Sequence, residues 1–196
     1  MILGMMVLLG ACHEDAVERG SWVPALEQTG FEYLRDSGGR IQAALQAGQK
    51  ELAAGNAVEA LASLADAENA TRILLYYDVP ITEVRQLIYD AGRMHALQRQ
   101  QEALNLLDRS AKVLLEVEQH GSNSVQQAIQ ELRTMTSDLQ MLLAEETQAM
   151  TARSKASLSK MVSAKFEVLG HKVNLLALKS DMVLSGADFG LETKVQ

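Results

Sequence analysis

The stretch EALASL at residues 59–64 returns as EALNLL at residues 102–107, 43 positions further along the chain. Ala53 and Ala96 stand at the same offset. A repeat of about 40 residues with small side chains where two helices cross is typical of helical hairpins. Alanines let two helices approach closely, and leucines fill the remaining space. The sequence therefore predicts that residues 40–120 form two similar helical hairpins.

The boundaries of four helices within this region follow from local signals. Apolar residues recur at spacings of three and four, which gives each helix one apolar face. Gly55-Asn56 predicts the end of the first helix, and Pro80 predicts the end of the second. The polar segment 98–101 separates the third helix from the fourth, which closes at His120-Gly121. The pairs resemble tetratricopeptide hairpins, although neither first helix begins with Trp or Tyr.

Residues 122–184 are predicted to form longer helices of a different kind. Gly and Pro are absent from residues 122–169, and apolar residues follow a heptad-like spacing in two runs. Two long helices that lie side by side and turn near residues 151–157 satisfy both runs. A single long helix that dimerises is the alternative. The second run is locally basic, which indicates a solvated face or contact with anionic lipid or an acidic partner.

Composition favours an all-α fold. Only 4% of the residues are aromatic and only two are proline, so the chain is poor in the residues on which sheets and their turns depend. The formal net charge of −7 argues against a general nucleic-acid binder, because neutralising phosphates requires a basic face. The single cysteine excludes an intramolecular disulfide and any cysteine-rich zinc or iron–sulfur site.

The chain begins with an apolar run, MILGMMVLLGA, that ends at Cys12. The run is too short to cross a membrane as a helix but is long enough for the core of a secretory signal. Leu9-Gly10-Ala11-Cys12 resembles a bacterial lipobox. This resemblance implies cleavage before Cys12 and a lipid on its sulfur, and His13 in place of Asp implies the outer membrane, facing the periplasm. The alternative is an apolar arm with an incidental buried cysteine.

These signals divide the chain into four parts. An apolar segment and a largely polar one precede the helical domain, and one short segment follows it. The parts are a lipoprotein-type signal peptide over residues 1–11, a tether over 12–39 with a short lead-in helix over 24–36, the helical domain over 40–184, and a flexible tail over 185–196. The domain itself comprises the hairpins over 40–120 and the long helices over 122–184.

The stretch 50–112 is similar to proteins of the YfdX family, which are helical proteins exported to the bacterial periplasm. The residues that carry the resemblance are Gly55-Asn56, Ala60, Tyr77, Pro80, Arg85, Asp90-Ala91 and Glu102-Ala103. The resemblance implies export and a helical fold. It also implies a link to acid, drug and heat stress tolerance, without an established catalytic activity.

Motifs for catalysis or cofactor binding are not found in the sequence. Gly38-Gly39 lacks the context of a phosphate-binding loop, and no metalloprotease, serine hydrolase or Cys–His motif is present. The four histidines have no partner at the spacing of a helical metal site. Carboxylate pairs such as Glu145-Glu146 are expected on solvated faces. We therefore expect no enzyme activity, no cofactor and no metal.

Two sets of residues are candidates for a functional role. His95 lies near Asp90 and Arg93, and protonation of a histidine near pH 6.5 makes it a candidate pH switch. The alternative is a histidine on a polar face with no role. Trp22, Tyr76 and Tyr77 are candidates to line a groove for a small hydrophobic molecule. The alternative for the two tyrosines is packing at a bend.

The sequence thus predicts a non-catalytic, lipid-anchored helical adaptor or stress-protective factor that binds other proteins. Binding is expected on the inner helices of the two hairpins, residues 40–54 and 82–97, because repeat hairpins expose such surfaces. The first alternative is a binder of a small hydrophobic molecule. The second is a structural homo-oligomer that forms a coiled coil through residues 122–184.

Overall fold

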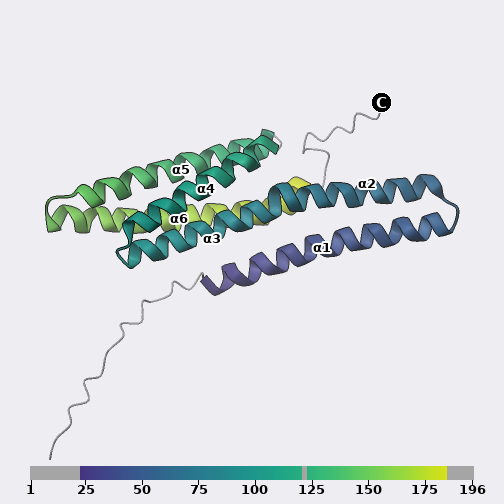
Figure 1. Ribbon diagram of the computed structural model, residues 1–196, viewed down its shortest axis with the longest axis horizontal. Helices are drawn as coiled ribbons and strands as arrows, with labels where there is room; N and C mark the ends of the chain where they lie inside the picture. The colour runs from purple at the N-terminus through teal and green to yellow at the C-terminus, as the bar shows by residue number, and fades with distance from the viewer. Residues whose placement is uncertain (1–22, 121–122, 185–196) are drawn as a thin grey trace, which may run out of the picture.

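The computed structural model describes residues 23–120 and 123–184, and within these ranges the chain is all-α, as predicted (Figure 1). No strand occurs in the part that is described. The helices are α1 (Val23–Ala53), α2 (Ala57–Ile73), the π-helix η1 (Leu74–Asp78), α3 (Val79–Ala96), α4 (Gln100–His120), α5 (Asn123–Gln148) and α6 (Ala152–Leu184). Among the helices of these two ranges, none combines the length and the apolar character needed to cross a membrane.

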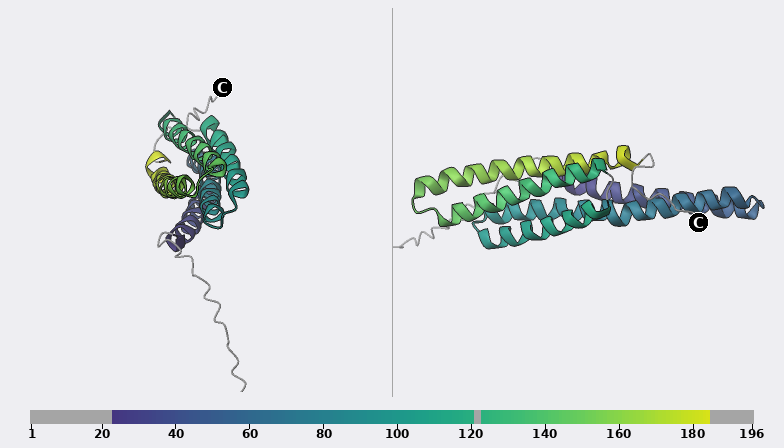
Figure 2. Two further views of the ribbon diagram at one scale, coloured as in Figure 1. Left: turned by 90° about the vertical axis from the view of Figure 1, so that its left-hand side faces the viewer. Right: turned by 90° about the horizontal axis from the view of Figure 1, so that it is seen from above.

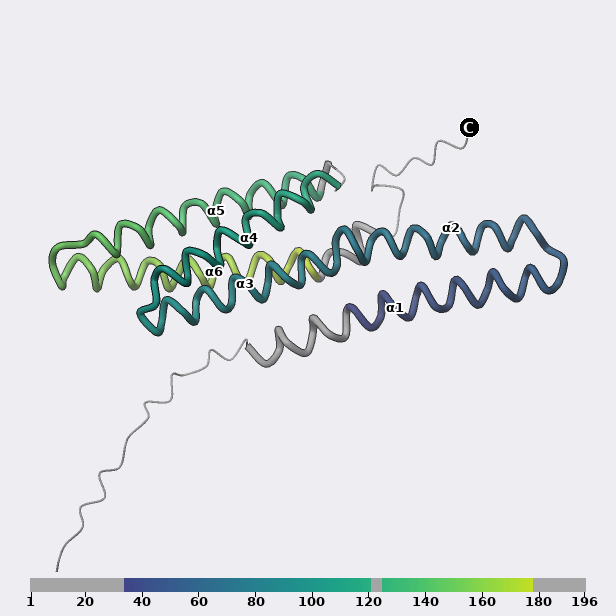
Figure 3. The backbone as a smooth tube through the Cα atoms, viewed as in Figure 1, coloured from purple at the N-terminus to yellow at the C-terminus, as the bar shows by residue number. Residues whose placement is uncertain are grey.

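A continuous rod made of α2, η1 and α3 runs through the middle of the molecule (Figures 1 and 2). On the α2 half, α1 packs along the rod. On the α3 half, α4, α5 and α6 complete a four-helix bundle with α3. The tetratricopeptide-like stacking of hairpins is not confirmed, because α2 continues into α3 instead of folding back beside it (Figure 3).

The helix does not end before Pro80, so this part of the prediction is wrong. Proline lacks an N–H, and in a helix its ring clashes with the carbonyl group four residues earlier. The chain widens into η1 just before Pro80, and the Val79 N–H bonds to the carbonyl of Leu74, five residues back. Such a wide turn commonly lets a helix pass an interruption with its axis bent rather than broken.

The break predicted between the lead-in helix over 24–36 and the helix over 40–54 is also absent, because α1 continues through Gly38 and Gly39. Ser37 is buried, and its hydroxyl donates to Asp78 Oδ2 at 2.6 Å. This contact with η1 fixes the middle of α1 against the rod. Tertiary contact therefore overrides the poor helix propensity of two successive glycines.

The turns α1–α2 and α3–α4 repeat each other at the offset of 43 residues. Gly55 and Gln98 are the positive-φ residues of the described chain, at 83° and 60°. Three backbone hydrogen bonds also recur at that offset. They run from Ala54, Gly55 and Asn56 to Lys50, Leu52 and Glu51, and from Leu97, Gln98 and Arg99 to Arg93, His95 and Met94. The first pair of helices and the second pair are thus built alike at their turns.

The core lies in the bundle, and it includes the inward-facing apolar residues of α5 and α6. Leu139 and Leu143 of α5 and Val162 and Leu169 of α6 are almost fully buried. The chain turns between Gln148 and Ala152, slightly earlier than predicted, where Thr151 Oγ1 accepts the Ser154 N–H and so caps α6. Residues 123–184 therefore form two helices packed side by side rather than one long helix.

Candidate functional site

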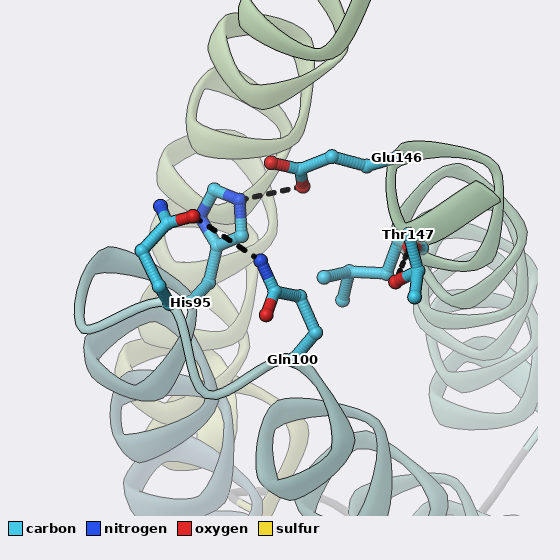
Figure 4. A network of polar contacts seen from close by, with 6 residues as sticks. His95, Gln100, Glu146 and Thr147 are labelled. Atoms are coloured by element: carbon cyan, nitrogen blue, oxygen red, sulfur yellow. Dashed lines mark hydrogen bonds and ion pairs between the residues drawn. The ribbon is translucent and has the colours of Figure 1, made fainter. Parts of the chain in front are cut away.

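A histidine and a glutamate meet in the interior of the bundle, where α3 and α5 end (Figure 4). His95 Nε2 lies 2.8 Å from Glu146 Oε2, and their side chains are 3% and 0% exposed. Glu146 Oε1 has no hydrogen-bond partner among the described residues. The ring of Phe166 lies 5.9 Å from the imidazole and closes the site on the side of α6. The hydrogen bond between imidazole and carboxylate offsets part of the cost of burying both groups.

Glu146 was predicted to be solvated together with Glu145, and for Glu146 this is wrong. Glu145 is exposed, whereas Glu146 faces the core. The sequence does carry a signal: Glu146 follows Leu139 by seven residues and Leu142 by four, so it continues the apolar stripe of α5. A carboxylate at a stripe position indicates a buried partner. His95 stands likewise four residues after Ala91 on the stripe of α3.

A shallow hollow of about 500 Å³ lies beside this pair. Its walls come from the α3–α4 turn, the first turn of α4 and the last turns of α5, and they include Gln98, Arg99, Glu102 and Thr147. Arg99 and Glu102 bond to each other, so the hollow presents no unpaired charge from that pair. No group of three or more side chains suited to hold a metal ion occurs in the described residues. The hollow therefore offers polar contacts from the α3–α4 turn, α4 and α5.

Tyr76 and Tyr77, which lie in η1, point in different directions. Tyr77 is fully buried and donates to the carbonyl of Leu176 at 3.1 Å. Burial, followed by the neighbouring Asp78 carboxylate, raises the pKa of the Tyr77 hydroxyl. Tyr76 is 48% exposed, and its ring lies 4.6 Å from that of His120. The structure therefore does not bring the two tyrosines together in an open groove: Tyr77 is packed in the core, and Tyr76 is half exposed.

Cys12 and Trp22 lie outside the described residues, so the lipid site and the third aromatic residue stay predictions. His95 has a defined partner in Glu146, and its role as a pH switch stays a prediction as well. Eight residues after Tyr77 along the rod, Arg85 Nε donates to Asn174 Oδ1 at 3.0 Å, and burial lowers the pKa of the Arg85 guanidinium. Tyr77 and Arg85 thus attach the rod to α6.

The α1/α2 hairpin carries a row of leucines open to solvent, which we call the leucine face. It consists of Leu45, Leu52, Leu61 and Leu64, with 42%, 66%, 68% and 45% of their surfaces exposed. Leu45 and Leu52 lie two turns apart on one side of α1. A Cβ atom at Gly48, between them, would lie 3.4 Å from the Leu64 side chain. The four leucines therefore form one surface across both helices.

The repeat shows what is unusual about the leucine face. At the offset of 43 residues, Leu45, Leu52 and Leu64 correspond to Ile88, His95 and Leu107. Those three residues are 2%, 3% and 0% exposed, because α5 and α6 cover that side of α3 and α4. The first hairpin thus presents the side that the second hairpin buries. The predicted binding helix 82–97 is itself covered, whereas helix 40–54 is open.

Comparison of the chain with protein-family models, with curated proteins and with solved structures finds no match. The resemblance to the YfdX family and to lipoprotein signals therefore rests on the sequence alone. The candidate sites are accordingly judged by their geometry.

Proposed function

We propose that the protein is a non-catalytic helical adaptor or stress-protective factor, held by a lipid on Cys12 at the periplasmic side of the bacterial outer membrane, that binds other proteins through the leucine face. The bundle of α3–α6 is the folded body, and the α1/α2 hairpin is the binding element. The lipobox resemblance at residues 9–12 supports the anchor.

The observation that carries this proposal is the exposure of the leucine face. Leu52 and Leu61, both about two-thirds exposed, lie in the last turn of α1 and the second turn of α2. The turn between these two helices lies at the end of the hairpin away from the bundle (Figure 1). Contiguous exposed apolar side chains cost solubility, and on folded proteins they commonly mark an interaction surface. Single exposed apolar residues do not have this meaning, but a row shared by two helices does. The arrangement therefore favours protein binding over binding of a small molecule at η1.

Membrane fractionation tests the anchor. Wild type and the variant Cys12→Ser are expressed from the same start, and inner and outer membranes are separated on a density gradient. We expect wild type in the outer-membrane fraction and the variant outside it. Equal distribution of the two proteins would overturn the anchor without affecting the binding proposal.

Site-specific photo-crosslinking in cells tests the binding element. A photoreactive amino acid replaces Leu52 on the leucine face, and in the matched control it replaces Leu115 of α4. Leu115 is 40% exposed but lies on the bundle half. We expect protein adducts of defined mass from position 52 and none from position 115. Adducts from neither position, or the same adducts from both, would contradict a binding role for the leucine face.

A further inference from the structure

We infer that the leucine face binds the leucine face of a second copy of this chain, so that two α1/α2 hairpins pack as a four-helix bundle. This inference rests on the proposed function, because it names the partner of the same surface. It differs from the coiled coil expected through residues 122–184, where α5 and α6 bury one apolar stripe each within the chain and leave Met161, Val168 and Leu175 of α6 about half exposed.

The second half of the molecule shows what kind of partner fits. The side of α3/α4 that corresponds to the leucine face is covered by α5 and α6, an antiparallel pair of amphipathic helices. The α1/α2 turn has the same hydrogen bonds as the α3/α4 turn, so the two hairpins present similar frames. We therefore expect a second pair of antiparallel helices with leucines on one side to pack against the leucine face. The α1/α2 hairpin keeps its leucine row exposed.

The charge of the leucine face suits a second copy better than a charged partner. Gln42 and Gln49 flank Leu45 on α1 at spacings of three and four residues, and both are exposed. On α2 the flanking charges are Glu68 and Arg72, which neutralise each other at 2.8 Å. These residues thus give the face no net charge, in a chain of net charge −7. In a two-fold dimer each patch contacts the same patch of the other copy. A patch without net charge can do this without electrostatic repulsion.

The size of the face is enough for a weak dimer. α2 has 17 residues. Such a helix is about 26 Å long, and two helices side by side are about 20 Å wide. Each copy therefore contributes about 500 Å² in projection, and about 1,000 Å² is the lower limit for a specific interface. We expect a dimer that dissociates on dilution.

Sedimentation velocity of the full chain with Cys12→Ser in mild detergent tests the inference over a range of concentrations. We expect the mass to rise from that of one 21.4 kDa chain to twice that value. The double variant Leu52→Lys/Leu61→Lys places two charges in the interface and should raise the dissociation constant at least tenfold. Leu115→Lys, the control on α4, should leave the dissociation constant unchanged.

Cysteine cross-linking with a short bis-maleimide locates the interface. In the Cys12→Ser background, Gln49→Cys places a thiol on the leucine face without changing a leucine. Ala43→Cys, six residues earlier, places it on the far side of α1, and both positions are exposed. We expect dimers cross-linked from position 49 and not from position 43.

The combined results distinguish failure of this inference from failure of the proposed function. A monomer at every concentration, or equal cross-linking from positions 43 and 49, overturns the second copy as partner. If position 52 still gives adducts with another protein in cells, the proposed binding role survives. If neither a dimer nor an adduct forms, both proposals fall.

Discussion

His95 and Glu146 face each other from the ends of two helices in the interior of the bundle, 51 residues apart in the sequence. Breaking such a buried pair leaves one polar group unpaired, at a cost of about 3–5 kcal/mol. We expect Glu146→Ala and His95→Ala each to lower the free energy of unfolding by about that amount, measured by urea denaturation. Glu145→Ala, at the exposed neighbour, should change it by less than about 0.5 kcal/mol.

The double variant His95→Leu/Glu146→Leu sharpens this prediction. Replacing both partners by apolar side chains removes the desolvation cost together with the pair, so the loss should be much smaller than either single loss. Additive losses would show that the two side chains do not depend on each other, contrary to their 2.8 Å contact.

Tyr77 gives the protein a dependence on alkaline pH. Its pKa is raised above the ordinary value of 10.0 by burial and by Asp78. Above pH 10 the unfolded chain loses the phenolic proton, whereas the folded chain keeps it. The free energy of unfolding should therefore fall by up to about 1.4 kcal/mol per pH unit, and the contribution is intact below pH 10.

Tyr77→Phe tests this dependence by unfolding at pH 7 to 11.5. The variant loses the hydrogen bond to Leu176, a cost of about 1 kcal/mol at neutral pH, but its stability should fall less steeply above pH 10 than that of wild type. The matched change Tyr76→Phe removes a hydroxyl from a half-exposed side chain. Identical alkaline slopes for wild type and Tyr77→Phe would contradict the burial of this hydroxyl.

At the scale of helices and turns, Gly55 and Gly39 differ in whether the backbone conformation requires a glycine. Gly55 has φ +83°, a conformation that costs an L side chain about 1 kcal/mol or more, so Gly55→Ala should destabilise the hairpin. Gly39 lies inside α1 with open space around a Cβ, so Gly39→Ala should stabilise by about 0.5–1 kcal/mol. Thermal unfolding of the two variants should shift in opposite directions.

The repeated turn supplies the control for that prediction. Gln98 takes the place of Gly55 at φ 60°, and glycine adopts this region without strain. Gln98→Gly should therefore stabilise the α3–α4 turn. A loss of stability would show that the Gln98 side chain, which accepts from Gln100 at 3.4 Å, contributes more than the strain costs.

Local signals in the sequence predicted the helices and most turns, because apolar spacing and Gly55-Asn56 act within a few residues. They did not predict that the chain would pass Gly38-Gly39 and Pro80 as helix. Those outcomes depend on contacts between distant segments, such as Ser37 with Asp78 and Tyr77 with Leu176. The burial of Glu146 has the same origin, since only the packing of α5 against α3 decides which face is covered.

At the scale of the whole molecule, the two halves of the rod are unequal in what they bury. The bundle encloses residues such as Leu107 and Ile129 completely, whereas α2 buries only Ala60, Ala67 and Ile73 among its described residues. Local opening costs less where fewer apolar contacts are lost. The molecule should therefore unfold from the tip of the α1/α2 hairpin toward the bundle.

Amide hydrogen exchange followed by mass spectrometry measures this gradient directly. Peptides from α4 and α5 should exchange only through global unfolding, and peptides around residues 50–62 should exchange through smaller openings. Binding of the leucine face to a second copy adds protection at the tip, because only the folded hairpin binds. We therefore expect exchange at residues 50–62 to slow as protein concentration rises in wild type and to stay constant in Leu52→Lys/Leu61→Lys. If the tip is as well protected as α5 in that variant at low concentration, the hairpin is stable on its own, and the unequal burial does not set the order of opening.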